Sequence, residues 1–287
     1  MAENIKTVLF VNLLKKNSRL ASDEICRELK NRNVETTVFS FEGKADFTLN
    51  DSWDIAFCLG GDGTALYTAR MLASSGIPIL PVHLGTLGFL AGIEWHEWTS
   101  VYDDWVNQCV KISNRVMLEF SVIRNNQIVY NNSCLNDLVI SSLGKAKLIR
   151  LRAETEIREG EFACLGHYRC DGLIIATPTG STAYSMASGG PILDPEMEAQ
   201  IINPICSFSL SSRPFVLPSR QKIYVNVEEN QRSAVILTID GQDTFELEPG
   251  DKIIIKQSPY FARFLTKNNS AYYTALKEKL SFGASNA

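Results

Sequence analysis

The chain has 287 residues, of which 45% are hydrophobic and 21% charged, a composition typical of a globular protein with one large or two smaller domains. Its formal net charge is −4, so no excess of positive charge favours nucleic acid or an anionic membrane surface as a partner. Seven cysteines without a Cys-x-x-Cys pair and three scattered histidines predict reduced thiols and no zinc site. No apolar run approaches the ~18 residues of a membrane span, and we expect a cytoplasmic protein.

The first 95 residues alternate between runs rich in β formers and segments with helical spacing. Apolar residues recur at helical intervals in 19–33 and 64–76, and Gly76 is placed to end the second helix. This alternation predicts an α/β domain with a largely parallel sheet. The predicted strands are 5–14, 34–41, 54–59 and 77–85.

The pattern changes near residue 95. Residues 94–112 have the spacing of one helix that crosses a domain boundary, and short β-like runs then dominate. An insertion at 181–190 and the last stretch, 272–280, have helical character. We therefore predict a β-rich second domain. Its predicted strands are 117–125, 127–141, 147–156, 172–177, 222–229, 233–241 and 251–258.

A glycine-rich bend, GGDGT at 60–64, follows the third predicted strand and opens a helix. Ligands of parallel sheets bind outside the carboxyl ends of strands, and N–H groups at a helix start can face a phosphate. The bend is not a Walker A loop, and Leu66 stands where G-x-G-x-x-G needs its third glycine. Two interpretations remain open: Asp62 is a turn residue near the helix cap, or it is an acid held against a ligand.

A second glycine-rich strand end lies at 81–92, with Gly85, Gly88, Gly92 and Phe89. Two adjacent strand ends with glycine loops predict a cleft. The alternative is a loop that turns toward the next domain, with Phe89 in the core.

The segment 170–195 combines a strand with a dense run of glycine and small hydroxyl residues. Such residues supply hydrogen-bond donors without bulk, and Tyr184 adds a stacking face, so we favour a ligand-binding loop over a capped helix. Asn136 and Asp137 lie between apolar residues; they either bind ribose hydroxyls or a base, or form a bulge or turn at a strand end. Asp240 and Gly241 are typical of a type I′ hairpin turn.

Together these segments resemble the NAD kinase family, in order and approximate spacing, over nearly the whole chain. A Gly-Gly-Asp-Gly bend alone is shared with lipid kinases and phosphofructokinases, whereas the block at 171–193 is specific. The motifs are GGDGT (60–64), LGTLGFL (84–90), LNDLVIS (135–141), DGLIIATPTGSTAYSMASGGPIL (171–193), LSSRPFVLP (210–218) and DGQ (240–242).

The resemblance implies an N-terminal α/β domain (1–95), a β-rich NAD-binding domain (96–264), and a segment (265–287) that packs back on the first domain. It implies phosphoryl transfer from ATP or polyphosphate to the 2′-hydroxyl of the adenosine ribose of NAD, forming NADP. A divalent cation, Mg²⁺ or Mn²⁺, and a homodimer or homotetramer are also implied, with neither nucleic acid nor a membrane as partner.

By the same resemblance Asp62 is the proton acceptor, and no side chain is implied as a metal ligand. The family usually has Glu where this chain has Asp137, so a direct contact there could become water-mediated. The residues implied to shape the phosphate loop or contact the dinucleotide are Gly60, Gly61, Gly63, Thr64, Phe89, Asn136, Asp137, Lys147, Arg169, Asp171, Thr182, Ala183, Tyr184, Ser185, Met186, Ala187, Asp240 and Gln242.

Two other classes remain open from the sequence. One is a lipid or sugar kinase that shares only the glycine bend, although the chain lacks a basic amphipathic membrane stretch. The other is a non-catalytic dinucleotide sensor on the same scaffold.

Overall fold

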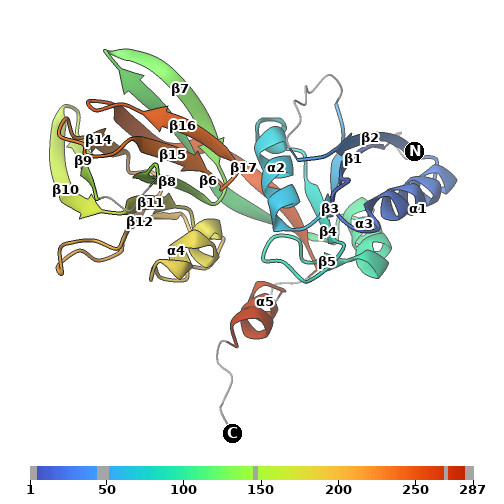
Figure 1. Cartoon of the computed structure of the whole chain (residues 1–287). Helices are drawn as coiled ribbons and strands as arrows, with labels where there is room; N and C mark the ends of the chain where they lie inside the picture. The colour runs from blue at the N-terminus through green and yellow to red at the C-terminus, as the bar shows by residue number, and fades with distance from the viewer. Residues whose placement is uncertain (1–4, 44–51, 145–147, 268–270, 282–287) are drawn as a thin grey trace, which may run out of the picture. The chain divides into compact units, whose positions relative to one another are not determined.

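The structure, a computed structural model, describes residues 5–43, 52–144, 148–267 and 271–281 (Figure 1). The chain forms two compact units, one from residues 1–114 and 262–287, the other from 115–261. The divisions therefore lie at 114/115 and 261/262, whereas the expected domain limits were 95/96 and 264/265. The first unit is α/β and the second is β-rich, so the predicted fold class is confirmed.

Strands and helices alternate along the first unit. Its elements are β1 (Lys6–Asn12), α1 (Ser18–Asn31), β2 (Glu35–Phe41), β3 (Ile55–Gly60), α2 (Asp62–Leu72), β4 (Ile79–His83), β5 (Ile93–Glu94), α3 (Trp98–Val106) and α5 (Ala271–Leu280). Strands pair in parallel in the order β2-β1-β3-β4, and β5 continues beside β4. Residues 8–11 of β1 are all buried, as expected for a parallel strand covered on both faces.

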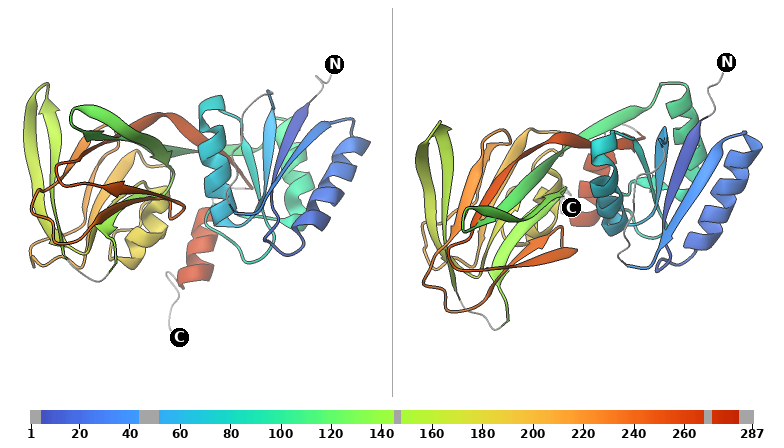
Figure 2. Two further views of the ribbon diagram at one scale, coloured as in Figure 1. Left: turned by 45° about the horizontal axis from the view of Figure 1, so that its top comes forward. Right: turned by 90° about the horizontal axis from the view of Figure 1, so that it is seen from above.

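Helices cover both faces of this sheet. Leu9 of β1 belongs to one buried cluster with Ile25 of α1 and Tyr102 of α3. The next residue, Phe10, points to the other face, where its ring meets that of Tyr67 in α2 with centroids 6.5 Å apart. Figure 2 shows α2 on one side of the sheet and α1 on the other. The unit is thus a three-layer sandwich, and α2 begins directly at the carboxyl end of β3.

The prediction of one helix over residues 94–112 is wrong. A 3₁₀ turn at Trp95–Glu97 precedes α3, which ends at Val106. Gln108 then adopts a left-handed conformation (φ 57°), and its N–H donates to the carbonyl of Trp105. Helices commonly stop at such a residue, but glycine or asparagine usually marks it, so a glutamine gave no signal in the sequence.

The second unit consists mainly of antiparallel strands. Its elements are β6 (Lys111–Arg124), β7 (Gln127–Cys134), β8 (Asp137–Ser142), β9 (Ile149–Arg158), β10 (Glu161–Cys170), β11 (Gly172–Ala176), a 3₁₀ turn (Thr179–Thr182), α4 (Tyr184–Ala187), β12 (Ala199–Ile205), β13 (Phe215–Pro218), β14 (Ile223–Val227), β15 (Val235–Ile239), β16 (Asp243–Leu247) and β17 (Lys252–Thr266). The first residues of β6 and the last residues of β17 belong to the first unit. Strands β10, β12, β13 and β16 were not predicted from the sequence; β12 contains Pro204, a residue type that is rare inside strands.

Two sheets enclose the core of this unit. One has the order β13-β12-β11-β8-β15-β16, and the other contains β10-β9-β14-β17 with β6 and β7. Leu138 and Ile140 of β8 lie in the cluster between the sheets, and the intervening Val139 lies in a smaller cluster on the outer face. The outer face of β8 is therefore the face on which residues 137, 139 and 141 project.

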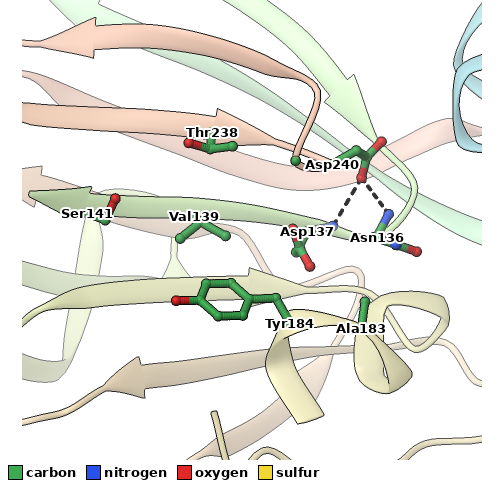
Figure 3. A pocket seen from close by; sticks show the side chains of 9 residues that line it. Asn136, Asp137, Val139, Ser141, Ala183, Tyr184, Thr238 and Asp240 are labelled. Carbon is green, nitrogen blue, oxygen red and sulfur yellow. Dashed lines mark hydrogen bonds between the residues drawn. The ribbon is translucent and has the colours of Figure 1, made fainter. Parts of the chain in front are cut away.

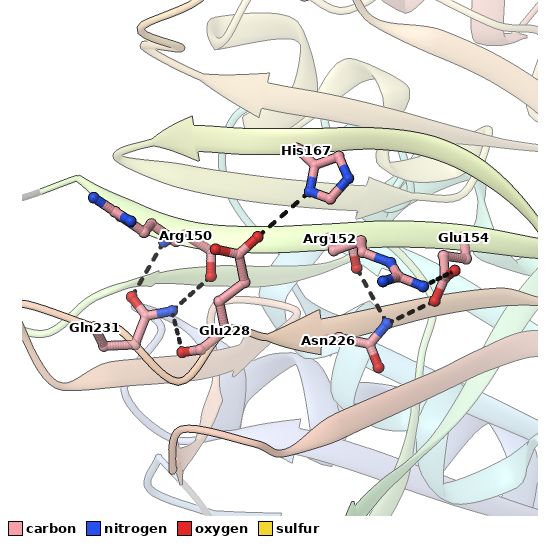
Figure 4. A network of polar contacts seen from close by, with 7 residues as sticks. All are labelled: Arg150, Arg152, Glu154, His167, Asn226, Glu228 and Gln231. Atoms are coloured by element: carbon pink, nitrogen blue, oxygen red, sulfur yellow. Dashed lines mark hydrogen bonds and ion pairs between the residues drawn. The ribbon is translucent and has the colours of Figure 1, made fainter.

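A network of mostly half-buried polar side chains ties β9 to its neighbours (Figure 4). The amide of Gln231 accepts from the N–H of Arg150 at 3.1 Å and donates to the carbonyl of Glu228 at 3.0 Å. Asn226 of β14 donates to Glu154 of β9 at 3.0 Å. These contacts align adjacent strands, and none of these residues lines the cavity described below.

Among the residues described, no helix is long and apolar enough to cross a membrane.

Candidate active site

Asp62 is the first residue of α2 and lies just beyond the end of β3. The N-cap of this helix is Gly61, which has no side chain to cap it. Oδ2 of Asp62 accepts from the N–H of Phe89 at 2.9 Å, and Oδ1 accepts from the N–H groups of Leu90 and Ala91, each at 3.0 Å. The two predicted glycine loops therefore meet at this one side chain.

The close approach of the two loops depends on Gly88. A Cβ atom added there would lie 1.9 Å from Oδ1 of Asp62. The N–H of Gly88 also donates to the carbonyl of Ala91 at 3.0 Å, which closes the turn formed by residues 88–91. We call residues 88–91 the Asp62-bound turn.

Thr64 faces the protein interior. The residue is 2% exposed, and its hydroxyl accepts a hydrogen bond from the Asn12 side chain at 3.2 Å. Thr64 thus supports the bend from within. Phe89, by contrast, is half-buried, and its ring packs against α5.

The second unit holds a cavity of about 380 Å³ beside β8 (Figure 3). Ala183 and Tyr184 lie along one side of it, and Thr238 and Asp240 along the other. The complete lining consists of Asn136, Asp137, Val139, Ser141, Ala183, Tyr184, Thr238, Asp240 and Gly241. Five residues predicted from the sequence are therefore brought together: Asn136, Asp137, Ala183, Tyr184 and Asp240.

Asp240 shapes the cavity by holding its neighbours. It lies in the β15–β16 hairpin, where positive φ values of 50° for Asp240 and 64° for Gly241 fit the predicted type I′ turn. Its carboxylate accepts from the N–H groups of Leu135, Asn136 and Asp137 at 3.1, 2.7 and 3.2 Å. These bonds fix the break between β7 and β8, which the sequence had suggested as one continuous strand.

The loop after β11 packs against the same break. The N–H of Thr177 donates to the carbonyl of Asn136 at 2.8 Å, and the N–H of Gly180 donates to the hydroxyl of Thr177 at 3.1 Å. A Cβ atom on Gly180 would lie 2.1 Å from the carbonyl oxygen of Asn136. Glycine is therefore required for this contact, which places Ala183 and Tyr184 beside Asn136.

Asp137 is 4% exposed and projects into the cavity. Burial raises the pKa of its carboxyl to about 7, and the nearby charge of Asp240 contributes in the same direction. Asp137 is thus a carboxyl group that can carry a proton near neutral pH. A protonated carboxyl can donate as well as accept a hydrogen bond.

Other predicted residues lie away from this cavity. Asp171 and Arg169 stand at the opposite end of β11 from the 177–187 segment, and Arg169 lies over the ring of Phe208 at 4.8 Å. Ser185 is buried and bonded to Asn203. Lys147 lies outside the described residues. The predicted residues of the second unit that do not line the cavity are Arg169, Asp171, Thr182, Ser185, Met186, Ala187 and Gln242.

Four lining residues were not predicted: Val139, Ser141, Thr238 and Gly241. Val139 and Ser141 follow Asp137 at intervals of two, so all three side chains project on the same face of β8. The sequence could have indicated them if the start of this strand at Asp137 had been recognised. Thr238 pairs with Val139 across the β15–β8 ladder, a relation that no local sequence pattern reveals.

Within the described ranges, no group of three or more His, Cys, Asp or Glu side chains is arranged to hold a metal ion.

Solved structures share this architecture. Yeast NADH kinase, complexed with NADH, superposes with a TM-score of 0.86 at 26% identity, covering 100% of this chain and 90% of that one. An NAD kinase from Archaeoglobus fulgidus in complex with ATP has a TM-score of 0.74 at 24% identity, covering 97% and 99%. The fold thus defines the class as that of the two-domain dinucleotide kinases.

The sequences specify the family. Models of the ATP-NAD kinase N-terminal and C-terminal domains match residues 2–110 and 135–266. The NAD kinase of Treponema denticola is 38% identical over 98% of each chain, and that of Desulforamulus reducens is 42% identical over 83% of this chain and 81% of the relative. The chain belongs to the NAD kinase family, as its motifs predicted, and the lipid or sugar kinase alternative is set aside.

Proposed function

We propose that this chain transfers a phosphoryl group from ATP to the 2′-hydroxyl of the adenosine ribose of NAD and so forms NADP. Family membership supports this reaction. The relatives are named NAD kinases, and the two structural neighbours hold NADH and ATP respectively. In the chain itself, the observation that carries the proposal is a carboxylate fixed at the end of β3 by three backbone N–H groups.

Asp62 is proposed as the general base. A carboxylate offers about four acceptor positions, two on each oxygen. Oδ1 accepts two N–H groups, whereas Oδ2 accepts one, so one position on Oδ2 stays open to a hydroxyl proton. A ribose hydroxyl is a weak nucleophile, and removal of its proton during attack on the phosphorus assists the transfer. The anchored carboxylate needs no reorganisation before it accepts that proton.

The cavity beside β8 is proposed to hold part of the dinucleotide. Asn136 offers an amide that both donates and accepts, and Asp137 offers a carboxyl group. Tyr184 is 48% exposed, which leaves its ring free to stack on a base or ribose. The remaining implied residues, from Gly60 to Gln242, stay predictions of dinucleotide or phosphate contact.

We expect the divalent cation, Mg²⁺ or Mn²⁺, to enter with the phosphates of ATP. Magnesium in nucleotide sites is commonly held by substrate phosphates and water with one or two carboxylates, so it needs no protein cage. The cation would neutralise charge on the transferred phosphoryl group.

The reaction is tested by measuring NADP or NADPH formation with every pair of donor and acceptor. The donors are ATP and polyphosphate, and the acceptors are NAD and NADH. We expect turnover with ATP and NAD. Binding of NAD by calorimetry without product from any pair would instead support a dinucleotide sensor.

The role of Asp62 is tested by Asp62→Asn, which keeps the size of the side chain, removes its basicity and replaces one acceptor oxygen by an NH2 donor. We expect turnover to fall at least ~100-fold, the usual contribution of general acid–base catalysis. Binding of NAD, measured by calorimetry, should persist. Near-normal turnover in this variant would refute the general-base assignment.

A homodimer or homotetramer in the cytoplasm is also proposed. The segment around β13 supports self-association, because its large apolar side chains are exposed: Phe208 by 67%, Leu210 by 90% and Phe215 by 50%.

A further inference from the structure

The Asp62-bound turn, residues 88–91, has a second neighbour in the same unit, the C-terminal helix α5. The ring of Phe89 lies 6.2 Å from that of Tyr272, measured between centroids. The ammonium group of Lys279 lies 5.0 Å from the centroid of the Phe89 ring, a cation–π distance. The backbone N–H of Phe89 therefore bonds to Asp62, and the side-chain ring of Phe89 packs on α5.

The sequence of α5 presents these contacts on one face. Tyr272, Ala275, Leu276 and Lys279 are spaced i, i+3, i+4 and i+7, the pattern of a single helical stripe. Ala275 and Leu276 are only 3% and 4% exposed, so the middle of this stripe is buried. Lys277, by contrast, is exposed and lies off the stripe.

Phe89 contacts Oδ2 of Asp62, the oxygen that is proposed to accept the hydroxyl proton. Phe89 donates to Oδ2, the oxygen with the open acceptor position, whereas Leu90 and Ala91 donate to Oδ1. A displacement of Phe89 therefore changes the direction in which Oδ2 presents that position. Misplacement of a catalytic group by a fraction of an ångström lowers the rate without removing the group.

We propose that α5 positions Asp62 for catalysis by clamping Phe89, with Lys279 and Tyr272 as positioning residues. The proposal rests on the assignment of Asp62 as the general base. It gives the C-terminal helix a role in turnover, although α5 contributes no group to the chemistry.

The test compares Lys279→Met, Lys279→Arg and Tyr272→Ala with Lys277→Met, all in the full chain. Lys277→Met is the matched control, because it makes the same charge change on the same helix away from the stripe. Two kinds of measurement are made: amide hydrogen exchange of a peptide spanning residues 84–95, and steady-state kinetics that give kcat and the KM values for ATP and NAD.

We expect Lys279→Met to raise exchange of the Asp62-bound turn and to lower kcat by a similar factor. The factor should be about 2- to 5-fold, as expected for the loss of one exposed cation–π contact. KM for ATP should change less than kcat. Lys279→Arg, which keeps a cation over the ring, should restore both quantities, and Tyr272→Ala should have an effect at least as large as Lys279→Met.

The proposal would be overturned if Lys279→Met and Tyr272→Ala both showed the same exchange of the 84–95 peptide as the control Lys277→Met. It would also be overturned if exchange of this peptide rose while kcat stayed unchanged. The exchange measurement does not depend on the chemistry. If Asp62→Asn keeps its turnover, the base assignment fails, while exchange still decides whether α5 holds the turn.

Discussion

Two aspartates of this protein do the same structural task. Asp62 accepts the N–H groups of Phe89, Leu90 and Ala91, and Asp240 accepts those of Leu135, Asn136 and Asp137. Hydrogen bonds to a charged acceptor are roughly twice as strong as neutral ones, so each carboxylate can fix a turn that has no regular pairing. In both cases the turn that is fixed carries residues proposed to meet the substrate.

Each aspartate was conspicuous in the sequence, but its partners were not. The glycines around Asp62 and the Asp-Gly pair at Asp240 located a strand end and a hairpin from local chemistry alone. The bonded N–H groups lie 27–29 residues from Asp62 and 103–105 residues from Asp240. Backbone donors have no side-chain signature, so only the folded structure reveals such pairs.

The raised pKa of Asp137 makes the stability of the protein depend on pH. With a folded pKa of about 7 and an ordinary value of 3.8, the unfolded chain loses this proton first as pH rises. This contribution to the free energy of unfolding is therefore complete below about pH 4 and decreases by about 1.4 kcal/mol per pH unit until about pH 7. Asp137→Asn removes this dependence.

We predict that the free energy of unfolding of Asp137→Asn minus that of the parent protein increases by roughly 2 to 3 kcal/mol as the pH rises from 5 to 8. Urea unfolding at several pH values measures the difference. Glu161→Gln, at an exposed position of β10, serves as the control and should show no such trend. Parallel stability curves for Asp137→Asn and the parent would contradict the pKa shift.

At the scale of elements, the 84–92 loop offers a matched pair of glycines. A Cβ atom at Gly88 would overlap Oδ1 of Asp62, whereas a Cβ atom at Gly85 would meet nothing within 4 Å. Gly88→Ala must therefore displace either the turn or the carboxylate, at a cost of about 1–3 kcal/mol from overpacking. Gly85→Ala should change stability by less than about 0.5 kcal/mol.

Thermal unfolding of the two alanine variants measures this contrast. A similar melting temperature for Gly88→Ala and Gly85→Ala would show that the two loops are not in close contact. NADP formation adds a second readout, because Gly88→Ala should also lower turnover by moving Asp62.

Elements with a clear hydrophobic period were predictable from the sequence. Elements whose limits depend on contacts with distant residues were not. The apolar runs of β1 and β3 and the stripes of α1 and α2 follow from local sequence. The break at residues 135–136 lies inside an uninterrupted β-like run, because it is imposed by Asp240 from another strand. Strand β12 contains Pro204, which cannot donate a ladder hydrogen bond; β13 pairs only with residues 199–202 of β12, so Pro204 lies beyond that ladder.

At the scale of the whole molecule, the two units differ in how the chain builds them. Residues 115–261 form the second unit as one continuous segment, with buried clusters drawn entirely from within it. The first unit is discontinuous, because residues 262–287 return to it. Leu265 is 1% exposed and belongs to the main cluster of that unit, and Phe264 pairs with Ile79 of β4.

This difference predicts how fragments behave. A fragment of residues 115–261 should fold alone and unfold cooperatively in urea, since its core is complete. A fragment of residues 1–114 should not, because it lacks Phe264, Leu265 and the buried face of α5. Loss of several large buried side chains costs about 2–5 kcal/mol each, which together approaches the total stability of a typical domain.

Fusion of residues 262–287 to residue 114 through a flexible linker should restore cooperative folding to the first unit. Circular dichroism during urea titration measures the outcome for the three polypeptides. Cooperative folding of 1–114 with the same free energy of unfolding as the fusion would show that the returning segment adds nothing to that unit. Because α5 is part of this segment, the same comparison also reports how firmly the helix that carries Lys279 is held.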